Sequence, residues 1–312
     1  MTIVKTCGKL YWAGEYAILV SGQLALIKAI PIYMTAEIKA SDVYRLYSDM
    51  FTYSVDLRPD SSYALIQETV ALVEEYLTAQ GVELQPFAID IRGKMEREGK
   101  KFGLGSSGSV VVLVIKAMLA FYERPAERDL LFKLASAVLL KRGDNGSMGD
   151  IACIVSEDLV LYQSFDREKV AQWLEKEDLK TVLARDWGFS IRSVEPALKF
   201  DFLVGWTKEV AVSSHMVKQI KNNMNASFLQ ASKETVNSLV KALQEGKEEK
   251  AMELLEQASQ VLEGLSSDIY TPSLRQLKDA SRNLKAVAKS SGAGGGDCGI
   301  ALSFDQDSTA LL

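Results

Sequence analysis

The feature that most constrains this chain is a short glycine- and serine-rich turn in front of a long apolar segment. Residues 101–109 read KFGLGSSGS, and only Lys116 interrupts the apolar run that follows to Tyr122. Glycines let a backbone approach a ligand closely, serines cap helices, and the free N–H groups at a helix start favour an anion. The pattern predicts a buried helix over residues 109–122 whose start faces a polyphosphate. The alternative is an ordinary loop with a well-capped helix.

Two more glycine-rich turns lie further along the chain. Residues 143–150 read GDNGSMGD, and residues 290–299 read SSGAGGGDCG. Taken alone, Asp150 is explained as a helix cap, because aspartate is a preferred capping residue. A glycine run is also typical of a flexible linker. The third turn, however, stands between an expected helix and an apolar strand, which favours close packing against a ligand.

Other signatures that use glycine or serine are excluded by their context. Residues 103–108 and 294–299 match GxGxxG formally, but neither follows a buried strand and opens a helix, as a dinucleotide site requires. No Gly-Lys pair is followed by Ser or Thr, so a P-loop is absent. The single histidine, His215, precedes Met216 rather than the Arg-Asp of a protein-kinase loop, and the GxSxG of serine hydrolases is missing.

Composition bounds the class of protein. The 312 residues are 47% hydrophobic and 25% charged, which is typical of a soluble globular chain of two domains. A net charge of −5 argues against a nucleic-acid partner. Three distant cysteines suit a reducing cytoplasm and, with one histidine, argue against a zinc site. A signal peptide is not recognisable, and the apolar run is too short to span a membrane.

Hydrophobic periodicity predicts the order of the main elements. Apolar residues at helical spacing, ended by Gly81, predict a helix over residues 63–80. Strands are expected at residues 3–7, 17–20, 24–27, 33–40, 44–48, 87–91, 200–205 and 299–304. Further helices are expected at residues 109–122 and 129–141, with several amphipathic helices between residues 214 and 288.

The three turns fall into the order of a known family. Residues 8–16, GKLYWAGEY, resemble the first motif of the GHMP kinases, with Tyr16 in place of the usual histidine. Residues 103–109, GLGSSGS, resemble the second motif, which grips the phosphates of ATP. Residues 291–299, SGAGGGDCG, resemble the third. Within this superfamily, KFGLGSSGSVVV at 101–112 and KRGDNGSMGDIA at 141–152 resemble the bacterial phosphomevalonate kinases.

The resemblance implies an α+β GHMP kinase fold with the active site in a cleft between two domains. Residues 1–190 are expected to form the N-terminal ATP-binding domain. Residues 191–312 are expected to form the C-terminal domain, cut short at its end. ATP and Mg²⁺ are the implied cofactors, and phosphomevalonate is the implied small-molecule partner.

The same resemblance, with the chemistry of the neighbouring side chains, gives the expected site. The catalytic candidates are Lys9, Lys101 and Asp150. The ATP-binding candidates are Lys101, Gly103, Leu104, Gly105, Ser106, Ser107, Gly108 and Ser109, with Ser107 next to the metal. The candidates for substrate binding are Lys9, Tyr16, Gly146, Ser147, Asp150, Ser213, His215, Ser291, Gly292 and Ala293. Lys101 has no counterpart in the superfamily motif and is included for its charge, the alternative being a solvated surface lysine. The alternative for His215 is a capping or packing role.

The implied reaction moves the γ-phosphoryl group of ATP to the phosphate of phosphomevalonate. Such transfers depend on positioning and charge stabilisation, so Lys9 and Lys101 are expected to neutralise the reacting phosphates. An acceptor phosphate with a second pKa of about 6 is already ionised near neutral pH. Asp150 is therefore expected to orient neighbouring groups rather than to act as an obligatory base. The alternatives are a mevalonate kinase, another small-molecule kinase of the superfamily, or a non-catalytic metabolite-binding protein.

Overall fold

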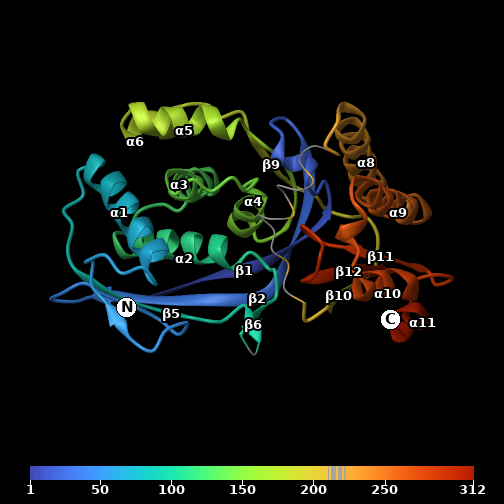
Figure 1. Ribbon diagram of the computed structural model, residues 1–312. Helices are drawn as coiled ribbons and strands as arrows, with labels where there is room; N and C mark the ends of the chain where they lie inside the picture. The colour runs from blue at the N-terminus through green and yellow to red at the C-terminus, as the bar shows by residue number, and fades with distance from the viewer. Residues whose placement is uncertain (98, 210, 212–215, 217–219, 221–222) are drawn as a thin grey trace.

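The structure is a computed structural model that describes all residues except 98, 210, 212–215, 217–219 and 221–222. It is an α+β protein with two main β-sheets (Figure 1). The first part of the chain forms β1 (Thr2–Ala13), η1 (Ala17–Leu19), β2 (Leu24–Ala40), β3 (Arg45–Ser48), β4 (Ser54–Val55), α1 (Ala64–Ala79), β5 (Phe87–Arg92), β6 (Glu96–Arg97), β7 (Lys100–Lys101), α2 (Ser106–Phe121), α3 (Arg128–Lys141), α4 (Gly149–Ser156), β8 (Leu159–Gln163), α5 (Arg167–Lys176), α6 (Leu179–Ala184) and β9 (Ser190–Ser193). The second part forms β10 (Asp201–Trp206), α8 (Ala226–Gln244), α9 (Glu248–Leu265), η3 (Ser267–Ile269), α10 (Pro272–Ala280), β11 (Ala286–Ser290), β12 (Cys298–Ser303) and α11 (Gln306–Leu311).

The two main sheets divide the sequence between them. Within the described residues, the larger sheet has seven strands in the order β4-β3-β5-β2-β8-β9, with β1 also pairing with β2. The smaller sheet has the order β10-β12-β11 and is antiparallel throughout. The larger sheet thus ends with β9 and the smaller one begins with β10. This change of sheet supports the proposal of two domains that meet near residue 190.

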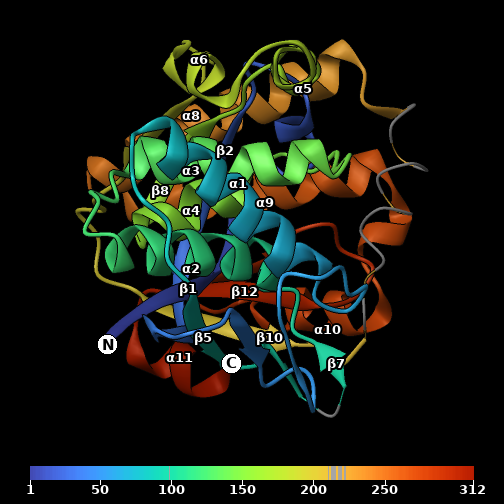
Figure 2. The same ribbon diagram turned by 90° about the vertical axis from the view of Figure 1, so that its left-hand side faces the viewer.

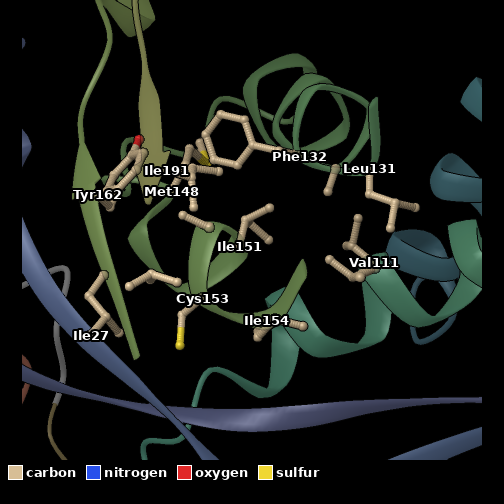
Figure 3. Packing of buried hydrophobic residues seen from close by; sticks show 14 of the residues in the cluster. Ile27, Val111, Leu131, Phe132, Met148, Ile151, Cys153, Ile154, Tyr162 and Ile191 are labelled. Atoms are coloured by element: carbon tan, nitrogen blue, oxygen red, sulfur yellow. The ribbon is translucent and has the colours of Figure 1, made fainter. Parts of the chain in front are cut away.

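The helices of the first part form layers on the larger sheet. Figures 1 and 2 show α2 next to the long strands β1 and β2, α3 beyond it, and α5 and α6 outermost. Because α2 is covered on nearly all sides, its sequence is apolar around most of its circumference. Figure 3 shows α4 at the centre of this packing, with Ile151 and Cys153 among side chains from α3, β8 and β9.

Strand β1 is irregular at two places. Its antiparallel pairing with β2 shifts register between Cys7 and Gly8, and again between Tyr11 and Ala13. Such bulges redirect the side chains that follow them. Residues 6–13 are all buried, because this part of β1 contacts α2 and α4 as well as α8 and α9. The segment between the two shifts carries Lys9 and Tyr11, two residues of the candidate site.

Most predicted elements are confirmed, and four need correction. The strands predicted at 24–27 and 33–40 are one strand, β2, and the third glycine-rich turn follows strand β11 instead of the expected helix. The helices predicted at 63–80 and 129–141 are α1 and α3, and the amphipathic helices are α8, α9 and α10. The strand predicted at 17–20 is wrong, because Tyr16 has a left-handed φ of 61° and the chain turns there into the 3₁₀ helix η1. The helix predicted from residue 109 begins at Ser106, directly after the left-handed Gly105.

Candidate active site

The start of α2 provides a set of unsatisfied donors. Gly105 precedes the helix with φ 82°, and no side chain caps this end among the described residues. The first backbone bond of the helix runs from the Ser109 N–H to the Gly105 carbonyl oxygen at 2.9 Å. The N–H groups of residues 106–108 therefore lack helical partners, and the dipole of a helix of 16 residues adds positive potential to them. This end of α2 is suited to bind a phosphate.

A second helix start lies beside the first. Asp150 is in the first turn of α4, and Met148 precedes that helix in a left-handed conformation with φ 62°. A Cβ atom at Gly108 would lie 2.7 Å from the Asp150 Oδ2 atom, so only glycine lets α2 and α4 approach this closely. Asp150 is thereby held next to the donors of α2.

Hydrogen bonds to two tyrosines fix the turn before α4. The Tyr11 hydroxyl lies 3.1 Å from the Ser147 Oγ atom, and the Tyr162 hydroxyl donates to the Ser147 carbonyl oxygen at 2.9 Å. The Gly149 N–H donates to the Ser147 Oγ atom at 3.2 Å. Ser147 is consequently oriented from β1, β8 and α4 together.

Lys9 projects from the irregular segment of β1 toward both helix starts. Its side chain is nearly buried, and the Nζ atom donates to the Gly103 carbonyl oxygen at 3.1 Å. The ammonium group also lies 5.4 Å from the centre of the Tyr11 ring. A Cβ atom at Gly105 would lie 3.0 Å from the Lys9 Cε atom. A side chain at position 105 would therefore press against Lys9, and glycine leaves room for the lysine.

The glycine-rich segment after β11 closes the other side of the site. The Ser291 Oγ atom donates to the Tyr11 carbonyl oxygen at 2.9 Å, and the Tyr16 hydroxyl donates to the Ala293 carbonyl oxygen at 2.5 Å. Asp297 lies at the end of this segment. A Cβ atom at Gly103 would be only 2.5 Å from its Oδ2 atom. Elements of both sheets therefore meet around one space.

This space is a cavity of about 370 Å³. Eleven of the predicted site residues line it: Lys9, Tyr16, Gly103, Gly105, Ser106, Ser107, Ser147, Asp150, Ser291, Gly292 and Ala293. The sequence did not single out six other lining residues, which are Tyr11, Glu15, Ile18, Leu19, Ala211 and Asp297. The cavity volume falls in the range of small-molecule sites.

Four predicted residues do not line the cavity, and the side chains of three others fall outside the described part of the structure. Leu104 is buried in the hydrophobic core, and the Ser109 hydroxyl lies 2.7 Å from the Thr6 hydroxyl. Gly108 and Gly146 do not line the cavity. Lys101 ends β7, but its side chain is outside the described part of the structure, as are Ser213 and His215. The assignments of all these residues stay predictions.

The electrostatics of the cavity depend on burial and on Lys9. Burial raises the pKa of Asp150 above its ordinary value, and the Lys9 charge opposes this rise. Burial likewise raises the pKa of Asp297, against the hydrogen bond from the Ala211 N–H and the charge of Lys9. Lys9 therefore favours the ionised form of both carboxyl groups, against the effect of burial.

The oxygen atoms of the cavity suit Mg²⁺. This ion keeps several waters and uses one or two carboxylates together with substrate phosphates. Ser107, Asp150 and Asp297 bring a hydroxyl and two carboxylates to the cavity wall. No group of three or more His, Cys, Asp or Glu side chains forms a protein-only metal cage among the residues that the structure describes. These donors fit an ion that arrives with a nucleotide.

Similarity to known families agrees with this geometry. The family of GHMP kinase N-terminal domains matches residues 64–157, and the family of GHMP kinase C-terminal domains matches residues 239–311. The chain belongs to the GHMP kinases.

Individual relatives narrow this classification. The phosphomevalonate kinase of Streptomyces sp. strain CL190 is 30% identical, over 96% of this chain and 90% of that protein. That of Saccharolobus solfataricus is 26% identical, over 98% and 91% of the two chains. The structure of Streptococcus pneumoniae phosphomevalonate kinase in complex with phosphomevalonate and AMPPNP is 72% identical. It has a TM-score of 0.98 and covers 100% of this chain and 94% of that one. Within the GHMP kinases, the particular family is that of the phosphomevalonate kinases.

No helix among the described residues combines the length and the apolar character needed to cross a bilayer.

Proposed function

We infer that this protein transfers the γ-phosphoryl group of ATP to the phosphate of (R)-5-phosphomevalonate, giving 5-diphosphomevalonate and ADP. The observation that carries this inference is the cavity itself. One wall has the free N–H groups of α2, and the same cavity is lined by Ser147 and by Lys9, whose ammonium group donates to the Gly103 carbonyl oxygen. A site that must bring two phosphate groups together needs positive potential in this position. The related S. pneumoniae enzyme was solved with phosphomevalonate and AMPPNP bound.

We propose a division of labour within the cavity. The start of α2, from Gly103 to Ser107, binds the ATP phosphates through backbone N–H groups and serine hydroxyls. Lys9 and Lys101 offset the charge of the reacting phosphates. Ser147 and Ser291 hold the acceptor. Lys101 enters this scheme through its place next to the turn and through its charge.

Asp150 is proposed to orient and balance charge rather than to remove a proton. The second pKa of a phosphate monoester is about 6, so the attacking oxygen is already mostly ionised near neutral pH. The Lys9 charge opposes the rise that burial causes in the pKa of Asp150, although the two side chains form no direct ion pair among the described residues. The Lys9 ammonium group instead donates to the Gly103 carbonyl oxygen. The aspartate therefore acts on the field around Lys9 and the acceptor.

Mg²⁺ is proposed to reach the site with ATP, next to the Ser107 hydroxyl. The ion supplies charge neutralisation between the phosphate groups when it is bound. A cytoplasmic location is also proposed. It is supported by Cys7, Cys153 and Cys298, which are unpaired and buried.

The test is a coupled assay of ADP release with mevalonate and phosphomevalonate as parallel acceptors. Phosphorus NMR of the product should show the coupled signals of a diphosphate monoester with phosphomevalonate as acceptor. Faster turnover of mevalonate under identical conditions would assign the protein to the mevalonate kinases instead. Binding of the metabolites without release of ADP would indicate a non-catalytic binding protein.

A further inference from the structure

A buried ion pair joins Glu15, a residue of the cavity wall, to Lys289 behind it. The Lys289 Nζ atom is 2.5 Å from the Glu15 Oε1 atom, and the two side chains are 1% and 3% exposed. Glu15 follows β1 of the larger sheet, whereas Lys289 belongs to β11 of the smaller sheet. The pair therefore connects the two main sheets at the site where both contribute to the cavity.

Burying two charges is costly, and hydrophobic residues of the same volume often stabilise a protein as well or better. A buried pair is thus a weak explanation of stability, but its hydrogen bonds are directional. Lys289 uses a second N–H to donate to the Ser290 carbonyl oxygen at 2.6 Å. In addition, the Ser290 N–H donates to the Tyr270 hydroxyl at 3.2 Å. The backbone at residue 290 is consequently held by both hydrogen bonds.

These hydrogen bonds hold the start of the glycine-rich loop that follows Ser290. The segment after Ser290 contains Gly292, Gly294, Gly295 and Gly296, all at positive φ. Glycines leave a chain many accessible conformations, so the position of this loop depends on the contacts that hold it. Its start is held by Lys289, whose partner Glu15 belongs to the other sheet.

Neutral contacts flank the ion pair on the cavity side. The Ser291 hydroxyl donates to the Tyr11 carbonyl oxygen, and the Tyr16 hydroxyl donates to the Ala293 carbonyl oxygen. Both contacts link the same two segments as the ion pair does. Glu15 and Lys289 make no hydrogen bond to the turn that precedes α2 within the described structure. Their direct effect is therefore confined to the wall opposite the phosphate-binding turn.

We propose that Glu15 and Lys289 are positioning residues that hold residues 291–293 in place over the acceptor. This inference rests on the proposed function, because it assigns that wall to phosphomevalonate and the start of α2 to ATP. The pair governs binding and transfer to the acceptor, with little effect on ATP. Charge and direction matter here more than volume, because the pair fixes the start of the loop, whereas the backbone bond from the Gly295 N–H to the Ile269 carbonyl oxygen holds its middle.

The test compares Glu15→Gln, Lys289→Met and the double variant. Misplacement of a reactant by about 1 Å can cost about a hundredfold in rate. For each single variant we expect a loss of about tenfold or more in kcat/KM for phosphomevalonate, while the KM for ATP stays within about twofold. Because the double variant leaves no unpaired buried charge, its loss should be smaller than the product of the two single losses.

A matched control removes another ion pair that lies away from the cavity. Lys116 on α2 is 2.7 Å from Glu157, and its side chain is 21% exposed. Lys116→Met should leave both KM values unchanged. Isothermal titration of the ligand-free variants with phosphomevalonate, and separately with AMPPNP, gives a readout that does not depend on turnover.

The possible results separate the two levels of inference. If the wild-type protein releases no ADP with phosphomevalonate, the proposed function fails. If the wild type is active and both single variants keep its kcat/KM, the positioning role is refuted. The role is also refuted if acceptor and nucleotide affinities fall equally, because that result indicates general loosening of the fold. If Lys289→Met does not fold, Glu15→Gln and the double variant decide the question in the same way.

Discussion

Replacement of Lys9 by methionine is the sharpest test of the cavity chemistry. Methionine keeps most of the length and apolar volume of the lysine stem and removes only the charge and its donors. The wild-type ammonium group is within a side chain that is 9% exposed and donates to the Gly103 carbonyl oxygen at 3.1 Å. The substitution therefore removes a charge that belongs to a largely buried residue of the cavity wall.

The expected effect follows from the position of the charge. Two unit charges about 4 Å apart interact by about 4 kcal/mol at an effective dielectric constant of about 20. Part of this attraction already exists with the bound substrates, so only the share that grows during transfer lowers the barrier. Loss of one preorganised donor typically costs about 100- to 1000-fold in kcat, or about 3–4 kcal/mol. We expect a loss in this range for Lys9→Met.

The assay is ADP release at saturating ATP and phosphomevalonate, followed by single-turnover measurements that separate transfer from product release. Lys5→Met is the matched control, because Lys5 is on the same strand β1 but is exposed, with its ammonium group over the Tyr33 ring. The control should keep the wild-type kcat. If Lys9→Met retains kcat within about threefold, electrostatic stabilisation by Lys9 is refuted.

Three further predictions concern other parts of the site. Burial raises the pKa of Asp150, so its ionised form destabilises the folded protein increasingly as pH rises above the ordinary value of 3.8. Asp150→Asn should therefore lower kcat. It should also raise the melting temperature of the ligand-free protein at pH 8, and this gain should shrink as the pH falls toward 4. Equal melting temperatures of the variant and the wild type at pH 8 would contradict this account. Ser107→Ala should raise the Mg²⁺ concentration needed for half-maximal activity more than it raises the KM for phosphomevalonate, and a wild-type Mg²⁺ titration would separate Ser107 from the metal. Gly103→Ala combines a φ of 77° with a Cβ position 2.5 Å from Asp297, whereas Gly81→Ala combines a φ of 75° with open space. The second change should lower stability by about 1 kcal/mol, and the first should lower it further and raise the KM for ATP; equal effects in chemical denaturation would show that Asp297 adjusts without cost.

Local sequence signals explain why much of the fold and of one cavity wall could be predicted. The apolar stripe of α1 and the turn before α2 each depend on residues that are close together in the sequence. The two glycines of that turn, Gly103 and Gly105, have positive φ in the structure. The prediction at residues 17–20 failed because Tyr16 takes a left-handed conformation that is rare for a tyrosine. Sequence composition carries no sign of such a turn.

The other cavity residues depend on long-range contacts that no local pattern contains. Tyr11 is an aromatic residue in a strand and has the sequence pattern of a core residue, yet its hydroxyl meets Ser147, distant in the chain. Glu15 and Asp297 acquire their roles only when β1 and β12 come together around the cavity. Glu15 lies in the first motif, residues 8–16, and Asp297 in the third, residues 291–299. A search of the three motifs for charged residues would therefore have identified both as candidates.

The two register shifts in β1 have a consequence for how this strand can diverge among related chains. Lys9 and Tyr11 face the cavity because one irregularity precedes them and another follows. In a strand, adding or removing one residue reverses the facing of every side chain after it. An exchange of one amino acid in β1 therefore alters one contact, whereas a change of length turns the lysine toward another face and also displaces the Glu15 turn. The distance along the chain from the first shift to Tyr16 is thus as much a part of the site as the residues themselves.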